Sequence, residues 1–373
     1  MKRPNFSEKL ILKIGPLTHK AHKAYKQSTH TQSIMGVKNL NQFVRKECPD
    51  AIKTVNLSDL AGKVVVIDAS IYMYRFIADQ ALLENMYTMV SLLLMRNVVP
   101  VFIFDGKPPD EKRDLLNRRQ HLKRIAERKY NMVKSQMETS CSRDEDANHL
   151  LKTLRRRFVR VCDADFERVK MLLQALGVQY IMATGEADAL CAQMVLKRKA
   201  HACMSDDTDM FVHGCPRVLR HLNLMDETAT LYDMSKILNL LGISMTEFRQ
   251  ICVVSGTDYN CTNAATAAND TPFHLHLKLT LKLFKQYKKT IQEASSTDGI
   301  VATDFYTWLY HNCSTINPRL KFDYDAITAI DDMFNVAANA RMKLPDCNKN
   351  ANNRVIDCDL LHTVMAHENF IFV

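Results

Sequence analysis

The sequence predicts an α/β fold with a mostly parallel central sheet flanked by helices. Residues 63–68 and 98–105 are short, almost wholly apolar runs of β-branched or aromatic residues, and each ends in an aspartate. Such runs are typical of strands that are buried on both faces. Residues 70–96 between them are long and apolar enough for a crossover helix, so we expect a β-α-β unit with two parallel strands.

Later segments continue this alternation. Residues 178–183, 201–205 and 218–222 are predicted strands, and a helix is predicted over about 186–199. This order is typical of an α/β domain with a largely parallel sheet. Because ligands of such sheets gather beyond the carboxyl ends of the strands, we expect Asp68, Asp105 and the acids after Met204 to meet at one rim.

The remaining segments are predicted to be mainly helical. Residues 110–160 are rich in Lys and Arg and contain no Gly or Pro, which predicts an inserted helical element with a break around 139–142. Two helices are predicted within 234–255 around Gly242, followed by a loop over 260–272. Residues 273–283 fit both strand and helix periodicity and are predicted as helix, and 300–373 contains helical fragments.

Composition limits the class of protein. Of 373 residues, 47% are hydrophobic and 24% charged, which is close to the globular average and excludes disordered and collagenous chains. The 11 cysteines form no C-x-x-C pair, so we expect buried thiols in a reducing compartment. No apolar run approaches the ~20 residues of a membrane helix. Residues 1–34 lack the apolar central region of a secretory signal peptide. We therefore expect an intracellular protein without a membrane segment.

The net charge of +9 is unevenly distributed. Residues 107–160 hold sixteen Lys or Arg against eight Asp or Glu, and residues 1–34 hold seven against one. A basic helical stretch with acids gathered elsewhere is typical of a phosphate-backbone binder with a separate acidic site. A solvated, salt-bridged helix would show the same charge, so the acids decide between the two interpretations.

Seven acids stand at strand ends, helix starts or turns. They are Asp68, Asp105, Glu186, Asp188, Asp207, Asp209 and Asp258. Taken singly, each is typical of an ordinary cap or turn. Gathered within a few ångströms, they would raise one another's pKa unless cations neutralised them. Oxygen ligands without His or Cys favour Mg²⁺ or Mn²⁺, and this many acids predict two ions. Two ions ~3.5–4 Å apart stabilise both the attacking and the leaving oxygen in phosphodiester hydrolysis.

Six short motifs follow one another along the chain. They are Met-Gly-Val-Lys-Asn-Leu at 35–40, Val-Ile-Asp-Ala-Ser at 66–70, Phe-Asp-Gly-Lys-Pro-Pro at 104–109, Gly-Glu-Ala-Asp-Ala at 185–189, Asp-Asp-Thr-Asp at 206–209 and Ser-Gly-Thr-Asp-Tyr at 255–259. In their sequence and order these motifs resemble those of the flap endonuclease and XPG-type family of structure-specific 5′ nucleases. The set also resembles the compact members that large DNA viruses carry.

The resemblance covers residues 35–259 and implies a PIN-like 5′ nuclease core. Its parts would be an N-terminal block over 35–106, a helical arch over about 107–160 and an internal block over 161–259. A basic extension over 1–34 would precede this core, and a C-terminal helical region over 260–373 would follow it.

The resemblance also implies roles for individual residues. Asp68, Asp105, Glu186 and Asp188 match the ligands of a first metal ion, and Asp207, Asp209 and Asp258 those of a second. Lys112 and Arg119 match the cations that reach the scissile phosphate, where they would stabilise transition-state charge. Tyr74 matches an aromatic residue on which a base stacks. The residues matching nucleic-acid contacts are Gly36, Arg118, Lys123, Arg124, Arg128 and Lys129.

Three departures from the family leave the substrate preference open. No glycine lies between Gly256 and Gly299, so the family's Gly-rich hairpin, which grips duplex DNA, has no counterpart. The segment between Asp68 and Asp105 is shorter than in cellular flap endonucleases and lacks room for a wedge that reads a 3′ flap. No sliding-clamp motif occurs, and residues 370–373 form only a hydrophobic tail.

We therefore expect a metal-dependent, structure-specific DNA nuclease that cleaves 5′ flaps or other junctions between single and double strands, in replication, repair or recombination. A 5′-3′ exonuclease or a junction resolvase of the same family is an open alternative. A non-catalytic DNA-binding scaffold or a PIN-type ribonuclease is a further one, although the seven acids and the basic arch favour the DNA nuclease. We expect a monomer in the nucleus or at a site of DNA replication, in the host cell if the protein is viral.

Overall fold

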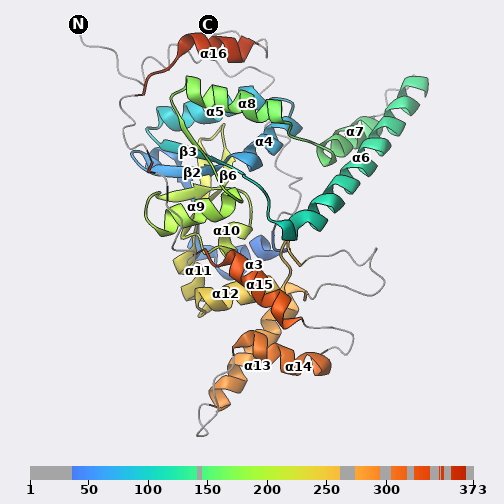
Figure 1. The fold of residues 1–373 in the computed structure, drawn as a ribbon, viewed down its shortest axis with the longest axis vertical. Coiled ribbons are helices and arrows are strands. Elements are labelled where there is room, and N and C mark those ends of the chain that lie inside the picture. Colours follow the sequence, from blue (N-terminus) through green and yellow to red (C-terminus); the bar gives the residue numbers. More distant parts are fainter. Residues whose placement is uncertain are drawn as a thin grey trace.

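A seven-stranded sheet forms the centre of the protein (Figure 1). The computed structural model describes residues 36–140, 145–260, 274–294, 304–316, 323–336, 344, 346–347 and 354–366. The strands are β1 Ile52–Asn56, β2 Val64–Asp68, β3 Val99–Phe104, β4 Gln179–Met182, β5 Ala202–Met204, β6 Arg217–Asn223 and β7 Thr228–Asp233. The predicted extension over 1–34 lies outside the described residues.

The sheet is parallel at its centre and antiparallel at one edge. Its order is β1-β7-β6-β5-β2-β3-β4, in which β6, β5, β2, β3 and β4 run parallel. Strand β7 is antiparallel to both β6 and β1. In the middle, Val66 pairs with Val101 on one side and with Cys203 on the other, and all three are buried. This order confirms the predicted α/β class.

Helices cover both faces of this sheet (Figure 1). The helices of the body are α3 Leu40–Glu47, α4 Ala69–Ala78, α5 Leu82–Met95, α8 Asp163–Ala175, α9 Ala187–Leu196, α10 Asp209–Val212, α11 Met234–Leu241 and α12 Met245–Val254. One hydrophobic core lies between the sheet and helices that include α4, α5 and α8, and a second lies on the face covered by α9, α10 and α12. The strands are thus buried on both faces, as their apolar sequences require.

The predicted crossover helix over 70–96 is wrong as a single helix. The segment folds as α4 and α5, with a break at residues 79–81. Gln80 there has a φ of 59°, a left-handed backbone conformation that ends a helix. Gly or Asn usually occupies this left-handed conformation. Because the residue here is a glutamine in an apolar segment, the break could not be predicted from the sequence.

Long helices project from the body as the predicted basic arch (Figure 1). They are α6 Arg113–Ser140 and α7 Glu145–Arg157, which flank the predicted break and follow the short 3₁₀ turn Asp110–Lys112. The two helices pack together, and the rings of Tyr130 and Phe158 meet at 5.3 Å between centroids. Arg156 lies 3.5 Å from Asp79, at the break between α4 and α5, and thereby joins the arch to the body.

The C-terminal part is helical where the structure describes it. Its helices are α13 Leu277–Ala294, α14 Phe305–Ile316, α15 Tyr324–Phe334 and α16 Cys358–Ala366. Helix α13 agrees with the predicted helix from Leu277 onward, whereas the predicted loop lies outside the described residues apart from Asn260. In the described ranges no single helix has the length and apolarity to cross a membrane, and α11 with α12 meets both criteria only as a pair bent by 84°.

Candidate active site

Parallel strands bring acidic residues to one rim of the sheet. Asp68 is the last residue of β2, and Asp105 follows β3 directly. Asp207 and Asp209 follow β5, and Glu186 is the N-cap residue of α9, which comes after β4. Because β5, β2, β3 and β4 are parallel neighbours, their carboxyl ends share one rim. The structure thus brings together the acids that the sequence placed at strand ends.

Asp68 is tied to the loop that carries Asp207. Its Oδ1 accepts a hydrogen bond from the backbone N–H of Ile71 at 3.4 Å and so caps α4. Its Oδ2 accepts from the Ser205 hydroxyl at 3.1 Å, and the same hydroxyl oxygen accepts from the backbone N–H of Asp207 at 3.2 Å. One buried serine therefore fixes the distance between two of the predicted ligands.

Asp105 and Glu186 hold the start of α9. The Asp105 Oδ1 accepts from the backbone N–H of Ala187 at 2.8 Å, which places Asp188 in the first turn of that helix beside it. The Glu186 carboxylate accepts from the Tyr259 hydroxyl at 2.6 Å and from the Lys112 ammonium at 2.5 Å. Two distant segments of the chain thus converge on Glu186.

The base of the arch supplies two cations to the acids. Lys112 is only 8% exposed, and its ammonium lies 4.7 Å from the centroid of the Tyr259 ring. Burial lowers the pKa of Lys112, but the charge and hydrogen bond of Glu186 outweigh this and leave it raised. Arg119 on α6 donates to Asp258 at 2.6 Å. The two predicted phosphate-contacting cations therefore both lie against predicted metal ligands.

Gly36 packs directly against the Asp-Asp-Thr-Asp loop. A Cβ at this position would lie 2.3 Å from the Thr208 Oγ1, 2.5 Å from the Asp209 Oδ1 and 2.8 Å from the Asp207 Oδ1. Its φ of +76° is also one that side chains disfavour. Only glycine allows the backbone to come this close to the acids. The observed contact of Gly36 is thus with the acid loop, and the nucleic-acid contact predicted for it from the sequence stays a prediction.

The carboxylates act on one another electrostatically. Burial raises the pKa of Asp68 to about 7, with further increases from the charges of Asp105 and Asp207. Burial likewise raises the pKa of Asp209 well above its usual value, and the charges of Asp207 and Asp258 add to this. The two predicted metal-ligand groups therefore form one cluster whose mutual repulsion favours a bound cation.

The residues of this cluster fit a hard divalent ion. In the described part of the chain, no three His, Cys, Asp or Glu side chains are already arranged to hold an ion. The donors nevertheless are all carboxylate oxygens, the type that Mg²⁺ and Mn²⁺ prefer. In addition, the Asp209 Oδ1 is buried without a hydrogen-bond partner. A buried carboxylate oxygen without a partner is costly, and a cation would satisfy it.

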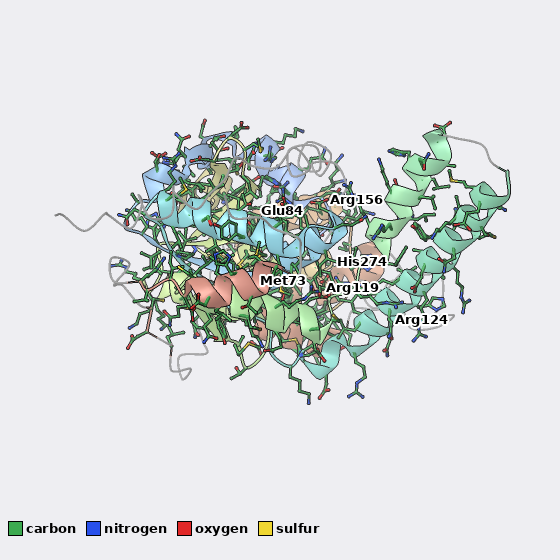
Figure 2. All side chains as sticks on the ribbon, turned by 90° about the horizontal axis from the view of Figure 1, so that it is seen from above. Met73, Glu84, Arg119, Arg124, Arg156 and His274 are labelled. Atoms are coloured by element: carbon green, nitrogen blue, oxygen red, sulfur yellow. The ribbon has the colours of Figure 1, made fainter. Side chains whose placement is uncertain are left out.

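The predicted cationic contacts with a single strand lie along α6, and the predicted aromatic contact, Tyr74, lies on α4 beside it. Tyr74 is 41% exposed, and the Lys123 ammonium lies 5.0 Å from the centroid of its ring. Arg118 is half-buried, and Arg124, Arg128 and Lys129 are exposed further along the helix. In Figure 2, Arg119 lies at the base of the arch and Arg124 farther out along it. Tyr74 is thus an accessible aromatic at the foot of a basic helix, the combination used to bind single strands.

Two residues that contact the acid cluster were not predicted from the sequence. Tyr259 follows Asp258 in the Ser-Gly-Thr-Asp-Tyr motif, yet its contacts with Glu186 and Lys112 cross 73 residues or more of sequence. Ser205 precedes the Asp-Asp-Thr-Asp run and bonds to Asp68. Their positions beside predicted ligands were a signal, but the partners became visible only in the fold.

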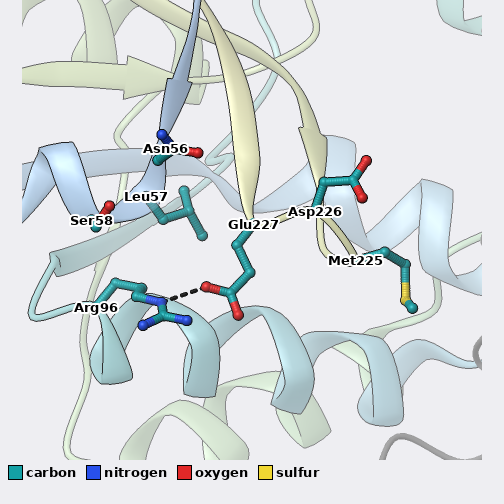
Figure 3. Close-up of a pocket in the computed structure, with 7 residues that line it drawn as sticks. All are labelled: Asn56, Leu57, Ser58, Arg96, Met225, Asp226 and Glu227. Carbon is teal, nitrogen blue, oxygen red and sulfur yellow. Dashed lines mark hydrogen bonds and ion pairs between the residues drawn. The ribbon is translucent and has the colours of Figure 1, made fainter.

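A polar hollow lies elsewhere, at the edge of the sheet that β1 and β7 form (Figure 3). It is lined by Asn56, Leu57, Ser58, Arg96, Met225, Asp226 and Glu227, and Arg96 pairs with Glu227. Arg96 precedes β3, so the hollow lies toward the amino ends of the parallel strands. None of the seven clustered acids lines it, and we assign it no part in the candidate active site.

Comparison with known proteins agrees with this geometry. The XPG N-terminal domain model matches residues 35–126, and the XPG I-region model matches residues 177–258. Flap endonuclease 1 of Cryptosporidium muris is 28% identical over 253 residues, 60% of this chain and 52% of that protein. Flap endonuclease 1-B of Oryza sativa subsp. indica is 29% identical over 293 residues, 73% of this chain and 67% of that protein. The matched segment thus spans about half to two thirds of these relatives.

Solved structures share the fold. The catalytic core of Rad2 in complex with DNA substrate superposes with a TM-score of 0.56 at 19% identity, covering 89% of this chain and 95% of that one. Human GEN1 in complex with Holliday junction DNA superposes with a TM-score of 0.52 at 17% identity, covering 90% and 73%. Two family models match in order over the segments that carry the clustered acids, and the chain therefore contains an XPG N-terminal domain and an XPG I-region.

Proposed function

We propose that the protein is a Mg²⁺-dependent DNA nuclease that hydrolyses phosphodiesters at 5′ flaps or other junctions between single and double strands. One observation carries the proposal: Lys112 and Arg119, at the base of the basic arch, form ion pairs with Glu186 and Asp258 of the acid cluster. The two XPG family models that match the chain support the same conclusion. The products would be 5′-phosphate and 3′-hydroxyl ends.

Each group of residues has a proposed task. Asp68, Asp105, Glu186 and Asp188 would hold one Mg²⁺ or Mn²⁺, and Asp207, Asp209 and Asp258 a second. When bound, such a pair of ions supplies activation of the attacking water and charge stabilisation at the leaving oxygen.

Lys112 and Arg119 are positioned to move from carboxylates to the scissile phosphate, where they would neutralise charge that develops in the transition state. Tyr74 would stack on a base, and the cations of α6 would contact the backbone of a single strand. Gly36 lets the chain pack close to the acid loop, and it stays a proposed nucleic-acid contact as well.

Cleavage of a four-way junction is the second candidate. It is favoured by the structural similarity to GEN1, which was solved with Holliday junction DNA. A 5′-3′ exonuclease remains a proposal within the same family. We further propose that the protein acts as a monomer where DNA is replicated, repaired or recombined, and that residues 1–34, 35–259 and 260–373 are its functional divisions.

A substrate panel tests the proposal. Purified protein is incubated with a 5′-flap duplex, a blunt duplex, a four-way junction and single-stranded RNA, each with Mg²⁺ or with EDTA. We expect cleavage of the flap in Mg²⁺ at the junction, and none in EDTA or on RNA. Cleavage in EDTA, or of RNA alone, would contradict the proposal, and preferential cutting of the four-way junction would favour the second candidate.

A further inference from the structure

Asp206 belongs to the Asp-Asp-Thr-Asp run but takes no part in the acid cluster. Its Oδ1 accepts a hydrogen bond from the backbone N–H of His221 at 2.7 Å, and its Oδ2 lies 3.7 Å from Arg75. Its backbone carbonyl accepts from Arg220. The neighbouring Asp207 instead bonds through its carboxylate to the backbone N–H of Asp209. Adjacent aspartates therefore have different partners: one anchors the loop, and the other belongs to the cluster.

Arg220 is the centre of this anchor. It is only 3% exposed, although it is a charged residue on strand β6. Its guanidinium donates to the Asp206 carbonyl and to the Asn41 Oδ1, the latter at 3.3 Å. The guanidinium carbon lies 5.5 Å from the centroid of the Phe211 ring and 5.7 Å from that of Tyr232. Contact with two rings and two oxygens leaves this side chain little freedom to move.

The anchor reaches helix α3, close to Gly36. The Tyr232 hydroxyl donates to the Asn41 Oδ1 at 2.8 Å, and the Arg45 Nε donates to the Tyr232 oxygen at 2.9 Å. Asn41 and Arg45 lie on α3, whereas Tyr232 lies on β7. We call Arg220, Asp206, Asn41 and Tyr232 the Arg220 network. It connects α3 and two strands to the loop that carries the second group of acids.

A strained backbone supports the same geometry. His221 has a φ of 53°, a value that non-glycine residues rarely adopt, and lies within a register shift between Arg220 and Asn223. This irregularity places the His221 N–H on the Asp206 carboxylate. A bulge of this kind re-aims side chains beside functional sites.

We propose that Arg220 is a positioning residue of the second metal site, which fixes the backbone at Asp206 so that Asp207 and Asp209 face the acid cluster. The inference rests on the proposed function in one respect only, the assignment of Asp207 and Asp209 as metal ligands. Asp206 accordingly acts as an anchor and not as a ligand. Supporting groups of this kind orient metal ligands, and their loss commonly weakens metal binding by about 10- to 100-fold.

Calorimetric titration with Mn²⁺ alone, without DNA, tests the proposal directly. We expect Arg220→Met to raise the Mn²⁺ Kd by at least about 10-fold. Arg220→Lys keeps the charge but cannot reach both oxygens at once, so we expect partial recovery to about 3-fold above wild type. Asn41→Ala keeps Arg220 and removes its side-chain acceptor, and we expect a rise of about 3-fold, which keeps the proposal testable if Arg220→Met does not fold.

Arg249→Met is the matched control. Arg249 is 7% exposed and pairs with Asp331 on α15 at 3.0 Å, so it resembles Arg220 in burial but has a partner outside the acid cluster. We expect this control to lower the melting temperature while the Mn²⁺ Kd stays within about 2-fold of wild type.

Three outcomes would overturn the proposal. They are an unchanged Mn²⁺ Kd in Arg220→Met, an equal increase in Arg249→Met, and Mn²⁺ binding that Asp206→Asn weakens as much as Asp207→Asn does. Wild-type protein that binds Mn²⁺ but cuts no DNA would contradict the proposed function and leave the positioning role supported. Wild-type protein that binds no Mn²⁺ would overturn both.

Discussion

Lys112 has a visible role in the fold beside its proposed role at the scissile phosphate. It is buried against Glu186 and over the ring of Tyr259, at the point where the arch leaves the body. A buried cation is stable only when it is paired. In the proposed function, a substrate phosphate would offer the ammonium a second anionic partner beside Glu186.

Substitution of Lys112 by Met should therefore affect the chemical step more than binding. We expect the single-turnover rate on a 5′-flap duplex to fall by about 100-fold, the scale on which one transition-state donor acts. The DNA Kd, measured in Ca²⁺, should change by less than about 3-fold. Lys107→Met removes an exposed lysine of the same segment and should leave the rate unchanged. Equal losses of rate and affinity in Lys112→Met would contradict the role.

Gly36 offers a second residue-scale test, because the chain contains a matched glycine. Gly36 and Gly62 have φ values of +76° and +71°, but a Cβ at Gly62 would meet nothing within 4 Å. Alanine at either position should cost about 1 kcal/mol of backbone strain. Only Gly36→Ala should also displace Asp207 and Asp209 and reduce Mg²⁺-dependent cleavage, by at least about 10-fold. Equal activity of the two variants would exclude a role for Gly36 at the acid loop.

At the scale of elements, strand-end aspartates were predictable and their supporting contacts were not. Buried apolar strands identified the sheet, and parallel strands must bring their carboxyl ends to one rim. The strands β1 and β7, on the antiparallel side of the sheet, and the helices α3 and α8 were not predicted. The two strands and α8 mix polar and apolar residues, and α3 is only eight residues long. Arg220 gave no signal either, since an arginine within a strand is normally exposed and its partners are remote in sequence.

The arch is the element whose charge should determine single-strand affinity. Replacing the exposed cations Arg124, Arg128 and Lys129 by Gln should weaken binding to a single-stranded 5′ flap. Each lost phosphate contact reduces the slope of log K against log salt by roughly 0.7, so the triple variant should lose about 2 from that slope.

A control triple removes equal charge elsewhere. Lys197, Arg198 and Lys199 are exposed after the end of α9, whose start carries Asp188. Their replacement by Gln should leave the salt slope within about 0.5 of wild type. Identical salt slopes for the two triple variants would show that the cations of the arch do not bind the single strand.

At the scale of the whole molecule, the acid cluster imposes a stability cost that depends on pH. Burial raises the pKa of Asp68 to about 7, so between its unfolded value and pH 7 the folded state binds more protons than the unfolded one. Stability of the metal-free protein must therefore fall as pH rises through this window. His213 acts in the opposite direction below pH 6.5, because burial lowers its pKa to about 4.

The test window is consequently pH 6.5–8, where folded His213 is already neutral and the folded Asp68 carboxyl loses its proton, so the Asp68 effect is the larger of the two. In EDTA, the melting temperature should decrease across this window as the cluster loses its last protons. Mg²⁺ should raise the melting temperature, and more strongly at pH 8 than at pH 6.5, because it binds the ionised carboxylates. Asp68→Asn should flatten the EDTA curve. A Mg²⁺ effect that is absent or independent of pH would argue against metal binding at the cluster.

The most direct measurement of the central claim is an anomalous difference map from a crystal soaked in Mn²⁺ at a concentration that supports cleavage. We predict two peaks roughly 4 Å apart, one among Asp68, Asp105, Glu186 and Asp188 and the other beside Asp207, Asp209 and Asp258. An Asp207→Asn crystal should lose the second peak. Absence of peaks at the rim of the sheet, or peaks only elsewhere, would contradict the assignment of these seven carboxylates as the metal-binding centre.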